Sequence, residues 1–525
     1  MAQILIADPI AQEGINILSR EHDVDVQTGL SPPELKKAIV DYAGLVVRSK
    51  TKVTAEVIEA APNLQVIGRA GVGVDNIDLA AATGRGISVV NAPTGNTLAA
   101  AEHTFALMLA LARNVPQANS SLRMGEWRRQ DFVGVEVRNK TLGIIGLGKV
   151  GSEVARRAHS FQMHLLGYDP YVPPEYARHL NVELVDMDRL LAESDFITIH
   201  TPLTSSTNCL IGASELARMK PEVRIINAAR GGLLDEEALL EALNQGKVSG
   251  AALDVFSQEP PRNEALLTHP RIIATPHLGA STVEAQVEVA KEVAEQLLLV
   301  LKGQPAQHTV NAPFVSPEVH AVLGPYLQVA STLGSLAIQL VEGQLQSLTV
   351  IYEGDIAEYD TAILKDSVLV GLLGAVTEER VNLVNAGLIA KQRGLQVTEQ
   401  KSAHSDQYNN LITLELHTST GAMVVAGTLM RDEVHLVRIN RYWLDAVPSS
   451  PYLLFIEHID RPGMIGAVGS ITGENDVNIS FMEVGRLQVR GQATMVVGLD
   501  DPMPDTVLAE VRAIPHVRSA RLVKL

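Results

Sequence analysis

The sequence contains a single cysteine, Cys209, among 525 residues. One thiol excludes an intramolecular disulfide and a cysteine-based metal cluster, so we expect a reduced protein without a metal site. The N-terminal stretch MAQILIADPI lacks a basic segment followed by a long apolar core, and no uninterrupted apolar run approaches the roughly 18 residues needed to span a bilayer. These absences predict a soluble protein of the cytoplasm, or of a plastid stroma if a transit peptide has been removed, with no membrane partner.

Positive charge is also scarce, because 43 Lys and Arg residues face 60 Asp and Glu residues, which gives a formal net charge of −17. The sequence has no basic run and no interleaving of basic with aromatic residues that would follow a phosphate backbone. We therefore expect no nucleic-acid partner. The length suggests about three or four domains, and a hydrophobic content of 46% is enough for several cores.

What the sequence does have is a glycine-rich turn, KTLGIIGLGKVG, between an apolar strand and an amphipathic helix. Gly146 permits the turn, Gly148 lets a pyrophosphate approach the backbone, and Gly151 lets the helix pack on the strand. This spacing alone is also compatible with a purely structural turn, since the chain has 40 glycines. Asp169, eighteen residues beyond Gly151 and after a second apolar run, would bond a ribose 2′-hydroxyl and repel a 2′-phosphate. The pattern predicts NAD rather than NADP.

Short apolar strands alternate with helical segments from residue 3 to about 95 and again from the glycine-rich turn to residue 276. This alternation predicts an α/β protein with two doubly wound parallel sheets. Long helices over 96–113 and 281–303 would join the two, with the second returning to the first domain. Parallel sheets bind ligands at the carboxyl ends of their strands, so we expect a cleft between the domains and hinge closure around it.

Beyond Gln304 the alternation stops. A proline-containing linker, APFVSP, precedes helical stretches predicted over 320–342 and 366–393 and then three alternating strands, which indicates an α+β domain with an antiparallel sheet. The last stretch predicts a small βαββαβ unit. The expected domains are 1–97 with 282–303 for substrate, 98–281 for the dinucleotide, 304–448 as an intervening domain and 449–525 as a regulatory domain.

Polar residues follow three strands of the second sheet, in NAARGG with Arg230, LDVFSQEP with Asp254 and Glu259, and TPHLGAS with His277. Taken singly, each has a purely structural interpretation as a surface or loop residue. Together they suit the oxidation of a secondary alcohol by NAD. Histidine can take the hydroxyl proton, a neighbouring glutamate favours the imidazolium, and arginine binds a carboxylate in a bidentate fork.

These motifs resemble the D-2-hydroxyacid dehydrogenases, and VVRSKTKV, GRAGVGVDN and APTGNT resemble the D-3-phosphoglycerate dehydrogenases within that family. The resemblance extends over the whole chain. It implies a Rossmann-type NAD domain, a flavodoxin-like substrate domain, an intervening domain and an ACT domain. It assigns acid/base catalysis to His277, its carboxylate partner to Glu259 and substrate orientation to Arg230. The cofactor contacts that it implies are Gly146, Gly148, Lys149, Val150, Gly151, Asp169, Thr201, Ala228, Ala229, Arg230, Asp254, His277, Gly279 and Ala280.

The same resemblance implies substrate contacts from the first domain at Arg48, Ser49 and Arg69, together with Arg230 and His277. Cations there are needed because a phosphorylated hydroxyacid carries about three negative charges and must enter an acidic protein. Solvated charges at strand ends are the alternative. The implied reaction is NAD-dependent oxidation of 3-phospho-D-glycerate to 3-phosphooxypyruvate, the first step of serine synthesis, by a dimer or tetramer of identical chains.

Regulation by L-serine is implied at His458, Asp460 and Asn478, which we expect on two adjacent strand ends. Asp460 departs from relatives that have asparagine there, and an ACT unit that serves only in assembly is the alternative. His435, Arg438 and Arg441 could form an anion site in the intervening domain. Rival functions are a glycerate or hydroxypyruvate reductase, and a corepressor-like binding protein that uses NAD as a sensed ligand.

Overall fold

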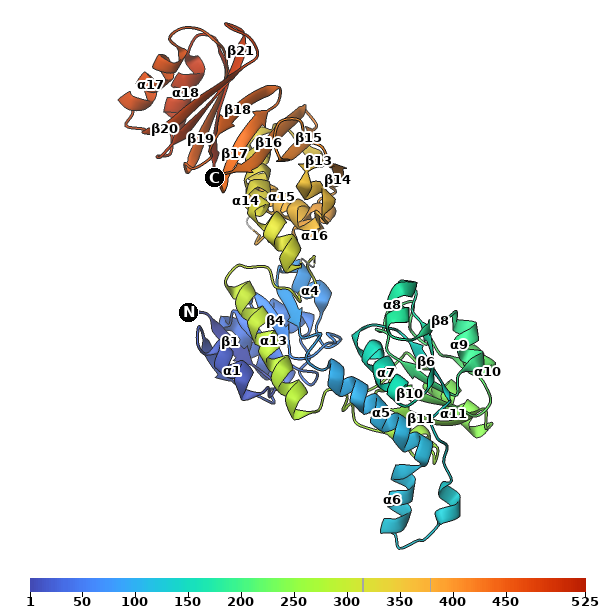
Figure 1. Cartoon of the computed structure of the whole chain (residues 1–525). Coiled ribbons are helices and arrows are strands. Elements are labelled where there is room, and N and C mark those ends of the chain that lie inside the picture. The colour runs from blue at the N-terminus through green and yellow to red at the C-terminus, as the bar shows by residue number, and fades with distance from the viewer. Residues whose placement is uncertain (314–315, 378) are drawn as a thin grey trace.

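The computed structural model describes residues 1–313, 316–377 and 379–525, which form four β-sheets in order along the chain. In Figure 1 the four units make an elongated molecule. The first sheet lies in the middle, the second lies to one side of it, and the third and fourth extend the chain toward its C-terminus.

The first sheet is parallel, with the strand order β2-β1-β3-β4-β5. This is the order of flavodoxin-like sheets and confirms that expectation. Helix α2 of this unit begins at Pro32, directly after Ser31, whose backbone amide donates to Oε2 of Glu34 over 2.8 Å. Its elements are β1 (Gln3–Ile6), α1 (Gln12–Leu18), β2 (Asp23–Val26), α2 (Pro32–Ala38), η1 (Ile39–Asp41), β3 (Gly44–Val47), α3 (Ala55–Glu59), β4 (Val66–Arg69), α4 (Leu79–Gly84) and β5 (Ser88–Asn91).

The second sheet is also parallel and has the order β12-β11-β10-β9-β6-β7-β8, which is the Rossmann order extended by one strand. The order reverses beside β6, so the glycine-rich turn lies at the switch point where such sheets bind ligands. Its elements are β6 (Thr141–Ile145), α7 (Lys149–Ser160), β7 (His164–Tyr168), α8 (Pro174–His179), β8 (Glu183–Leu184), α9 (Met187–Glu193), β9 (Phe196–Ile199), α10 (Ala213–Arg218), β10 (Val223–Asn227), α11 (Glu236–Asn244), β11 (Val248–Leu253), α12 (Glu264–Leu267) and β12 (Ile272–Ala274).

Two long helices connect these sheets. Helix α5 (Thr97–Arg113) leaves the first sheet and packs into the core of the second, where Phe105 and Met108 are buried. Helix α13 (Val283–Leu301) returns to the first sheet, where Val293 and Leu297 are buried against its strands. Each helix thus belongs to one sheet while its first turn lies at the crossing between them, which is where a hinge would act.

A helical arm follows α5. It comprises α6 (Val115–Arg123) and η2 (Arg129–Phe132) and projects from the body of the molecule in Figure 1. Met124, Trp127 and Val133 on this arm have 76, 82 and 81% of their surface exposed, which is unusual for large apolar side chains in a single folded chain.

The third sheet is mixed, which corrects the expected antiparallel sheet. Its order is β14-β13-β15-β16-β17-β18, and β13 pairs in parallel with β14 while the other pairs are antiparallel. The helical stretch expected over 366–393 is interrupted, because α15 ends at Gly374 and α16 starts at Ala386; residue 378 lies outside the described residues. The elements are α14 (Pro317–Leu340), β13 (Leu345–Gly354), η3 (Asp355–Glu358), α15 (Ala362–Gly374), α16 (Ala386–Gln392), β14 (Gln396–Ser402), β15 (Asn410–Thr418), β16 (Ala422–Met430), β17 (Glu433–Ile439) and β18 (Tyr442–Ala446).

Helix α14 is long and apolar. By length and hydropathy, residues Glu318–Leu340 could span a membrane. In the structure Val329, Leu333 and Leu336 of this helix are buried in the core between α15 and the third sheet. Burial inside the intervening unit therefore accounts for part of this apolar composition.

The fourth sheet is the expected βαββαβ unit, with the antiparallel order β20-β21-β19-β22. It is joined firmly to α14, since Gln339 exchanges two hydrogen bonds with the backbone of Lys524 and Arg521 donates to the Leu340 carbonyl. Leu453 and Phe455 complete the core of the intervening unit. The elements are β19 (Tyr452–Ile459), α17 (Met464–Glu474), β20 (Ile479–Arg486), β21 (Gln492–Leu499), α18 (Asp505–Ala513) and β22 (Val517–Lys524).

The C-terminal half also contacts the first sheet. Nδ2 of Asn382 donates to the Gly86 carbonyl over 2.6 Å, in the turn that leads into β5. Along the edge of β5 that does not pair with β4, residues 308–311 pair with the β5 backbone, and Val310 donates to the Val89 carbonyl over 2.7 Å.

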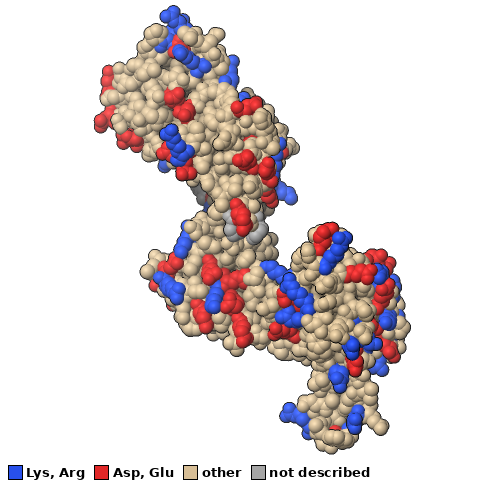
Figure 2. All heavy atoms as spheres, in the orientation of Figure 1, with Lys and Arg blue, Asp and Glu red and all other residues tan. Residues whose placement is uncertain are grey.

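Figure 2 shows Lys and Arg interspersed with Asp and Glu over the visible face of all four units.

Candidate active site

A cavity of about 740 Å³ lies between the carboxyl ends of the first two sheets. The first sheet contributes the residues that follow β3, β4 and β5, and the second contributes those that follow β6, β9, β10, β11 and β12. The helix starts of α5 and α13 close its sides. Predicted site residues that line it are Arg48, Ser49, Arg69, Lys149, Val150, Thr201, Ala228, Ala229, Arg230, Glu259, His277, Gly279 and Ala280.

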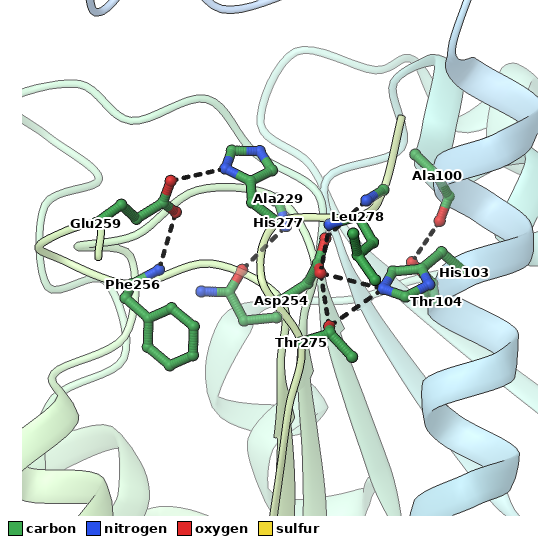
Figure 3. Close-up of polar contacts among 12 residues, drawn as sticks. Ala100, His103, Thr104, Ala229, Asp254, Phe256, Glu259, Thr275, His277 and Leu278 are labelled. Atoms are coloured by element: carbon green, nitrogen blue, oxygen red, sulfur yellow. Dashed lines mark hydrogen bonds and ion pairs between the residues drawn. The ribbon is translucent and has the colours of Figure 1, made fainter. Parts of the chain in front are cut away.

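His277 and Glu259 form a close pair in this cavity. Nδ1 of His277 lies 2.8 Å from Oε2 of Glu259, and the Phe256 amide donates to the other carboxylate oxygen over 3.2 Å (Figure 3). Partial burial would raise the pKa of Glu259, but the hydrogen bond and charge of His277 outweigh it and hold the pKa below its usual value. The carboxylate therefore stays ionised and orients the imidazole, leaving Nε2 for the cavity.

The backbone at His277 has a φ of 54°, in the left-handed region that non-glycine residues seldom adopt. This conformation is held by the preceding strand ends, because the His277 amide donates to the Asp254 carbonyl over 2.9 Å. Left-handed conformations of this kind concentrate at functional sites, where the surrounding structure holds them.

The Asp254 carboxylate is fully buried and lies behind this loop, outside the lining of the cavity. It accepts hydrogen bonds from the hydroxyl of Thr275 and from the amides of Leu278 and Gly279, over 2.6, 2.7 and 2.8 Å. His103 of α5 also contacts it (Figure 3). Burial would raise the pKa of Asp254, but these hydrogen bonds, led by that of His103, hold it below its usual value.

Three arginines from the two sheets converge on the cavity. Arg69 ends β4 and is largely buried, and its Nε has no hydrogen-bond partner among the described residues. Burial, and then the neighbouring charge of Arg230, lowers the pKa of Arg69 to about 10. Arg48 follows β3, and its amide donates to the buried carboxylate of Asp8 over 2.7 Å. The cationic cluster would bind an anion with several charges, since such an anion would relieve the repulsion within it.

The glycine-rich turn has the geometry expected of a pyrophosphate site. Gly146 has a φ of 94°, and a Cβ on Gly151 would collide with the Gly146 carbonyl oxygen. By contrast, a Cβ on Gly148 would meet no atom within 4 Å, so open space lies over the N-terminus of α7. Two glycines thus serve backbone packing, while Gly148 leaves room for a ligand at the positive end of the helix.

Two further residues suit a dinucleotide. Oδ2 of Asp169, after β7, accepts from the Leu147 amide over 2.9 Å and Oδ1 accepts from the Tyr171 amide, so the carboxylate is fixed beside the glycine-rich turn. Oγ1 of Thr201 is buried and has no hydrogen-bond partner in the described parts of the chain, and Thr201 is one of the residues that line the cavity. An unpaired buried hydroxyl is uncommon without a ligand to bond it. The donor and acceptor set therefore fits NAD.

The structure does not assemble the three predicted regulatory residues. His458 is buried and lines a separate cavity of about 300 Å³ with Arg441 and Arg518, where burial lowers its pKa. Asp460 follows β19 and Asn478 precedes β20. Because β21 separates these parallel-running strands, the two residues lie at opposite ends of the sheet, and the expectation of adjacent strand ends is wrong.

Asp460 and Asn478 also have local partners. The carboxylate of Asp460 accepts a hydrogen bond from Arg486, and this bond lowers the pKa of Asp460. Asn478 donates to Asp500 over 2.6 Å. Of the predicted anion cluster, His435 contacts Asp445 and Arg438 lies over the ring of Trp443. Of these three predicted residues, His435, Arg438 and Arg441, only Arg441 lines the cavity beside His458.

Sequence reasoning missed several residues of the site. His200 follows β9, lines the cavity and is partly buried, and burial lowers its pKa to about 4. Gly73 and Asp75 lie in the motif GRAGVGVDN, of which only Arg69 was assigned to the site. Oδ2 of Asp75 lies 3.8 Å from Nε of Arg230 across the cleft. These residues follow strands of the parallel sheets, and that position in the sequence could have placed them in the site. His103 lies within a helix and had no such signal.

Comparison with known proteins agrees with this geometry. Residues 105–279 match the family of D-isomer specific 2-hydroxyacid dehydrogenases in its NAD binding domain, 322–440 match the D-3-phosphoglycerate dehydrogenase intervening domain, and 452–516 match the ACT domain. A D-3-phosphoglycerate dehydrogenase of Synechocystis sp. is 48% identical, over 100% of this chain and 95% of that protein. One from Methanocaldococcus jannaschii is 44% identical over 100% of both chains.

Among solved structures, an NAD-dependent formate dehydrogenase from Staphylococcus aureus in complex with NAD is similar to the first two units. It is 32% identical with a TM-score of 0.53, and the match covers 58% of this chain and 97% of that one. The cofactor expectation is therefore confirmed for the domain that carries the glycine-rich turn. The chain belongs to the D-3-phosphoglycerate dehydrogenase family of D-isomer specific 2-hydroxyacid dehydrogenases.

Proposed function

We propose that the protein oxidises the C2 hydroxyl of 3-phospho-D-glycerate to give 3-phosphooxypyruvate, the first step of the phosphorylated route to L-serine. NAD, when bound, supplies the hydride acceptor. The observation that carries this proposal is the convergence of the His277–Glu259 pair with Arg48, Arg69 and Arg230 on one cavity. An acid/base pair serves alcohol oxidation, and the surplus of cations serves a substrate with a carboxylate and a phosphate.

His277 takes the hydroxyl proton. Its Nδ1 is held by Glu259, so Nε2 is the nitrogen that faces substrate and accepts the proton as the alcohol becomes a ketone. Glu259 then stabilises the imidazolium, as an adjacent carboxylate does for any cationic imidazole. The reverse reaction uses the same pair, with His277 donating the proton to the ketone oxygen.

The arginines divide the substrate between them. Arg230 follows β10 in the dinucleotide-binding sheet and binds the carboxylate next to the reacting carbon, while Arg48 and Arg69 come from the other sheet and bind the phosphate with Ser49. Because the two ends of the substrate contact different sheets, binding favours closure of the cleft. Closure excludes water from the reacting atoms.

The residues around the glycine-rich turn hold NAD. The N-terminus of α7 at Lys149 and Val150 faces the pyrophosphate, and Asp169 accepts from the adenosine ribose. Thr201 gains the partner that its hydroxyl lacks. Gly279 and Ala280 line the same cavity as Ala228 and Ala229, with Gly279 close to the Ala228 carbonyl.

The experiment that tests this function follows NADH absorbance after NAD is mixed with 3-phospho-D-glycerate or with D-glycerate. We expect NADH from the phosphorylated acid in preference. A preference for D-glycerate would favour a glycerate or hydroxypyruvate reductase. NAD binding without turnover of either acid would favour a corepressor-like protein.

The ACT domain indicates regulation by an amino acid, and we propose L-serine as that effector. Asp460 and Asn478 lie at opposite ends of one sheet, so a single chain cannot hold serine between them. Two ACT domains placed side by side would bring Asp460 of one chain to Asn478 of the other. The bonds between Gln339 and Lys524 transmit a change there to α14, and Asn382 transmits it to the first sheet.

We further propose that the protein is a homo-oligomer, a dimer or tetramer, in the cytoplasm. The exposed Met124, Trp127 and Val133 of the arm support this, because an apolar surface of this kind is usually covered by a partner. Equilibrium sedimentation of the full chain, compared with Trp127→Glu, measures the state directly.

A further inference from the structure

His103 lies on α5, the helix that crosses between the first two sheets, and connects this helix to the loop that carries His277. Nε2 of His103 lies 3.1 Å from Oδ1 of Asp254 and 3.3 Å from Oγ1 of Thr275 (Figure 3). The side chain of Asp254 has no exposed surface, and that of His103 has 19%. A charged carboxylate in such a place depends on every donor that reaches it.

The four groups that surround the Asp254 carboxylate come from two sources. Thr275, Leu278 and Gly279 belong to the loop after β12, which bends around the carboxylate with His277 at its centre. His103 is the contribution of α5. Asp254 therefore works as a bridge, with the catalytic loop on one side and α5 on the other.

The position of His103 on α5 gives this bridge a consequence for catalysis. Ala100, one turn earlier, lines the cavity, and Thr97 at the start of the helix lies at the crossing between the sheets. A Cβ added to Gly279 would lie 3.4 Å from Asp254 and 3.9 Å from Ala100, so helix, carboxylate and loop are already in close contact. A change in the His103 contact would move the loop relative to α5.

We propose that His103 is a positioning residue for the oxidation. Its Nε2–H donates to Asp254 and so fixes the loop that places the His277 imidazole against Glu259 and the substrate hydroxyl. This inference rests on the proposed function for its kinetic consequence. The geometric part, that His103 orders residues 275–279, stands independently of the substrate.

The test compares three substitutions of His103. Gln has its side-chain nitrogen as many bonds from Cα as Nε2 of histidine, so His103→Gln keeps the donor. His103→Leu removes it, and His103→Asn keeps an amide that is too short to reach. Glu102→Gln is the matched control, because Glu102 is the neighbouring residue on α5, is exposed and pairs with Arg157 instead.

We expect His103→Leu and His103→Asn to lower kcat by about 10- to 100-fold, since misplacing a catalytic group by about 1 Å can cost 10²-fold. KM for 3-phosphoglycerate and Kd for NADH should change less than kcat, because His103 is not among the residues that line the cavity. With substrate deuterated at C2, the isotope effect on kcat should be at least as large as in the wild type. His103→Gln should restore most of the rate, and Glu102→Gln should match the wild type.

Hydrogen exchange of the peptide that contains Leu278 and Gly279 supplies a readout that needs no turnover. Its amides should exchange faster in His103→Leu and His103→Asn, and at the wild-type rate in His103→Gln. Equal loss of rate and protection in all three variants, or none in any, would overturn the proposal. Wild-type enzyme that fails to oxidise 3-phosphoglycerate would instead overturn the function, while the exchange rates would still decide the role of His103.

Discussion

Nδ1 of His277 lies 2.8 Å from Oε2 of Glu259, although the two residues follow different strands of the second sheet. The pair forms because β11 and β12 are parallel neighbours, so their carboxyl ends meet at one edge. The same edge carries Arg230 after β10. One sheet therefore supplies the base, the carboxylate that orients it and the cation that holds the substrate.

Removal of the base is the first prediction. His277→Ala should lower kcat by about 10²-fold or more, the usual contribution of a general acid/base, with Kd for NAD little changed. Glu259→Gln should have a smaller effect, because the imidazole remains but loses its ionised partner. His159→Ala, at an exposed histidine of α7, is the control. Steady-state kinetics and NADH titration measure both quantities, and near wild-type kcat in His277→Ala would refute the assignment.

Cofactor choice gives the second prediction. Wild type should strongly prefer NAD, since the Asp169 carboxylate would repel a 2′-phosphate, and Asp169→Ala should narrow that preference mainly by weakening NAD binding. Part of the weakening should arise within the protein, because Oδ2 of Asp169 also accepts from the Leu147 amide in the glycine-rich turn. Comparable kcat/KM for NAD and NADP in the wild type would contradict this reading.

The third prediction concerns stability and pH. Asp366 in α15 is buried, and burial raises its pKa to about 6. An unfolded aspartate has a pKa of about 3.9, so the folded state binds more protons between these values and loses stability as the pH rises from about 4 to about 6. The loss at pH 7.5 is on the order of 2 to 3 kcal/mol.

Asp366→Asn stays neutral at every pH and should therefore unfold at higher urea concentration than wild type at pH 7.5. The difference should shrink at pH 5, where most wild-type Asp366 is still protonated. Asp501→Asn, at an exposed aspartate, should change neither midpoint. A wild type that is as stable as Asp366→Asn at pH 7.5 would show that Asp366 does not titrate as described.

Inhibition by serine is the fourth prediction. Serine should inhibit the full chain, and Asn478→Ala should shift inhibition to higher concentration. A truncation after Pro313 should be insensitive, and it keeps residues 308–311, which bond the backbone of β5. If serine acts by weakening substrate binding, then by linkage the substrate must weaken serine binding by the same factor. The corresponding coupling free energy is typically about 1–3 kcal/mol. The regulatory proposal fails if calorimetry detects no serine binding at millimolar concentration.

Much of the fold follows from the sequence because its signals are local. The strand before Gly146 and the helix after Gly151 are fixed by a short apolar run and by glycine spacing, and both occur as expected. Residues at strand ends, such as Arg230 and His277, could be placed near one another because parallel strands end at one edge.

In the intervening unit, local sequence signals do not predict every element. Strand β14 is polar and mostly exposed at an edge of its sheet, so it has no apolar alternation to reveal it. The helical stretch expected over 366–393 is interrupted where Asn382 and Asn385 bond the connection. The backbone amide of Asn382 donates to Oδ1 of Asn385 over 2.8 Å, and the Asn385 side chain donates to the Arg380 carbonyl. These are side-chain bonds to nearby backbone, which compete with a helix and leave little trace in its periodicity.

The site itself divides in the same way. Glu259 and His277 could be paired from sequence, whereas the burial of Asp254 and its contact with His103 depend on how α5 packs on the second sheet. The regulatory residues could not be placed, because the order of strands in the fourth sheet, and not their order in sequence, separates Asp460 from Asn478.

The central claim is that this cavity selects a phosphorylated 2-hydroxyacid, and the ratio of kcat/KM for 3-phospho-D-glycerate to that for D-glycerate tests it most directly. The measurement is made on wild type and on Arg48→Gln, whose side chain lines the first-sheet side of the cavity. Hydrogen bonds to charged groups contribute about 1.5–3 kcal/mol, so the substitution should lower kcat/KM for the phosphorylated acid by about 10- to 150-fold and leave that for D-glycerate nearly unchanged. A wild type that prefers D-glycerate, or an Arg48→Gln variant that loses both activities equally, would contradict the account.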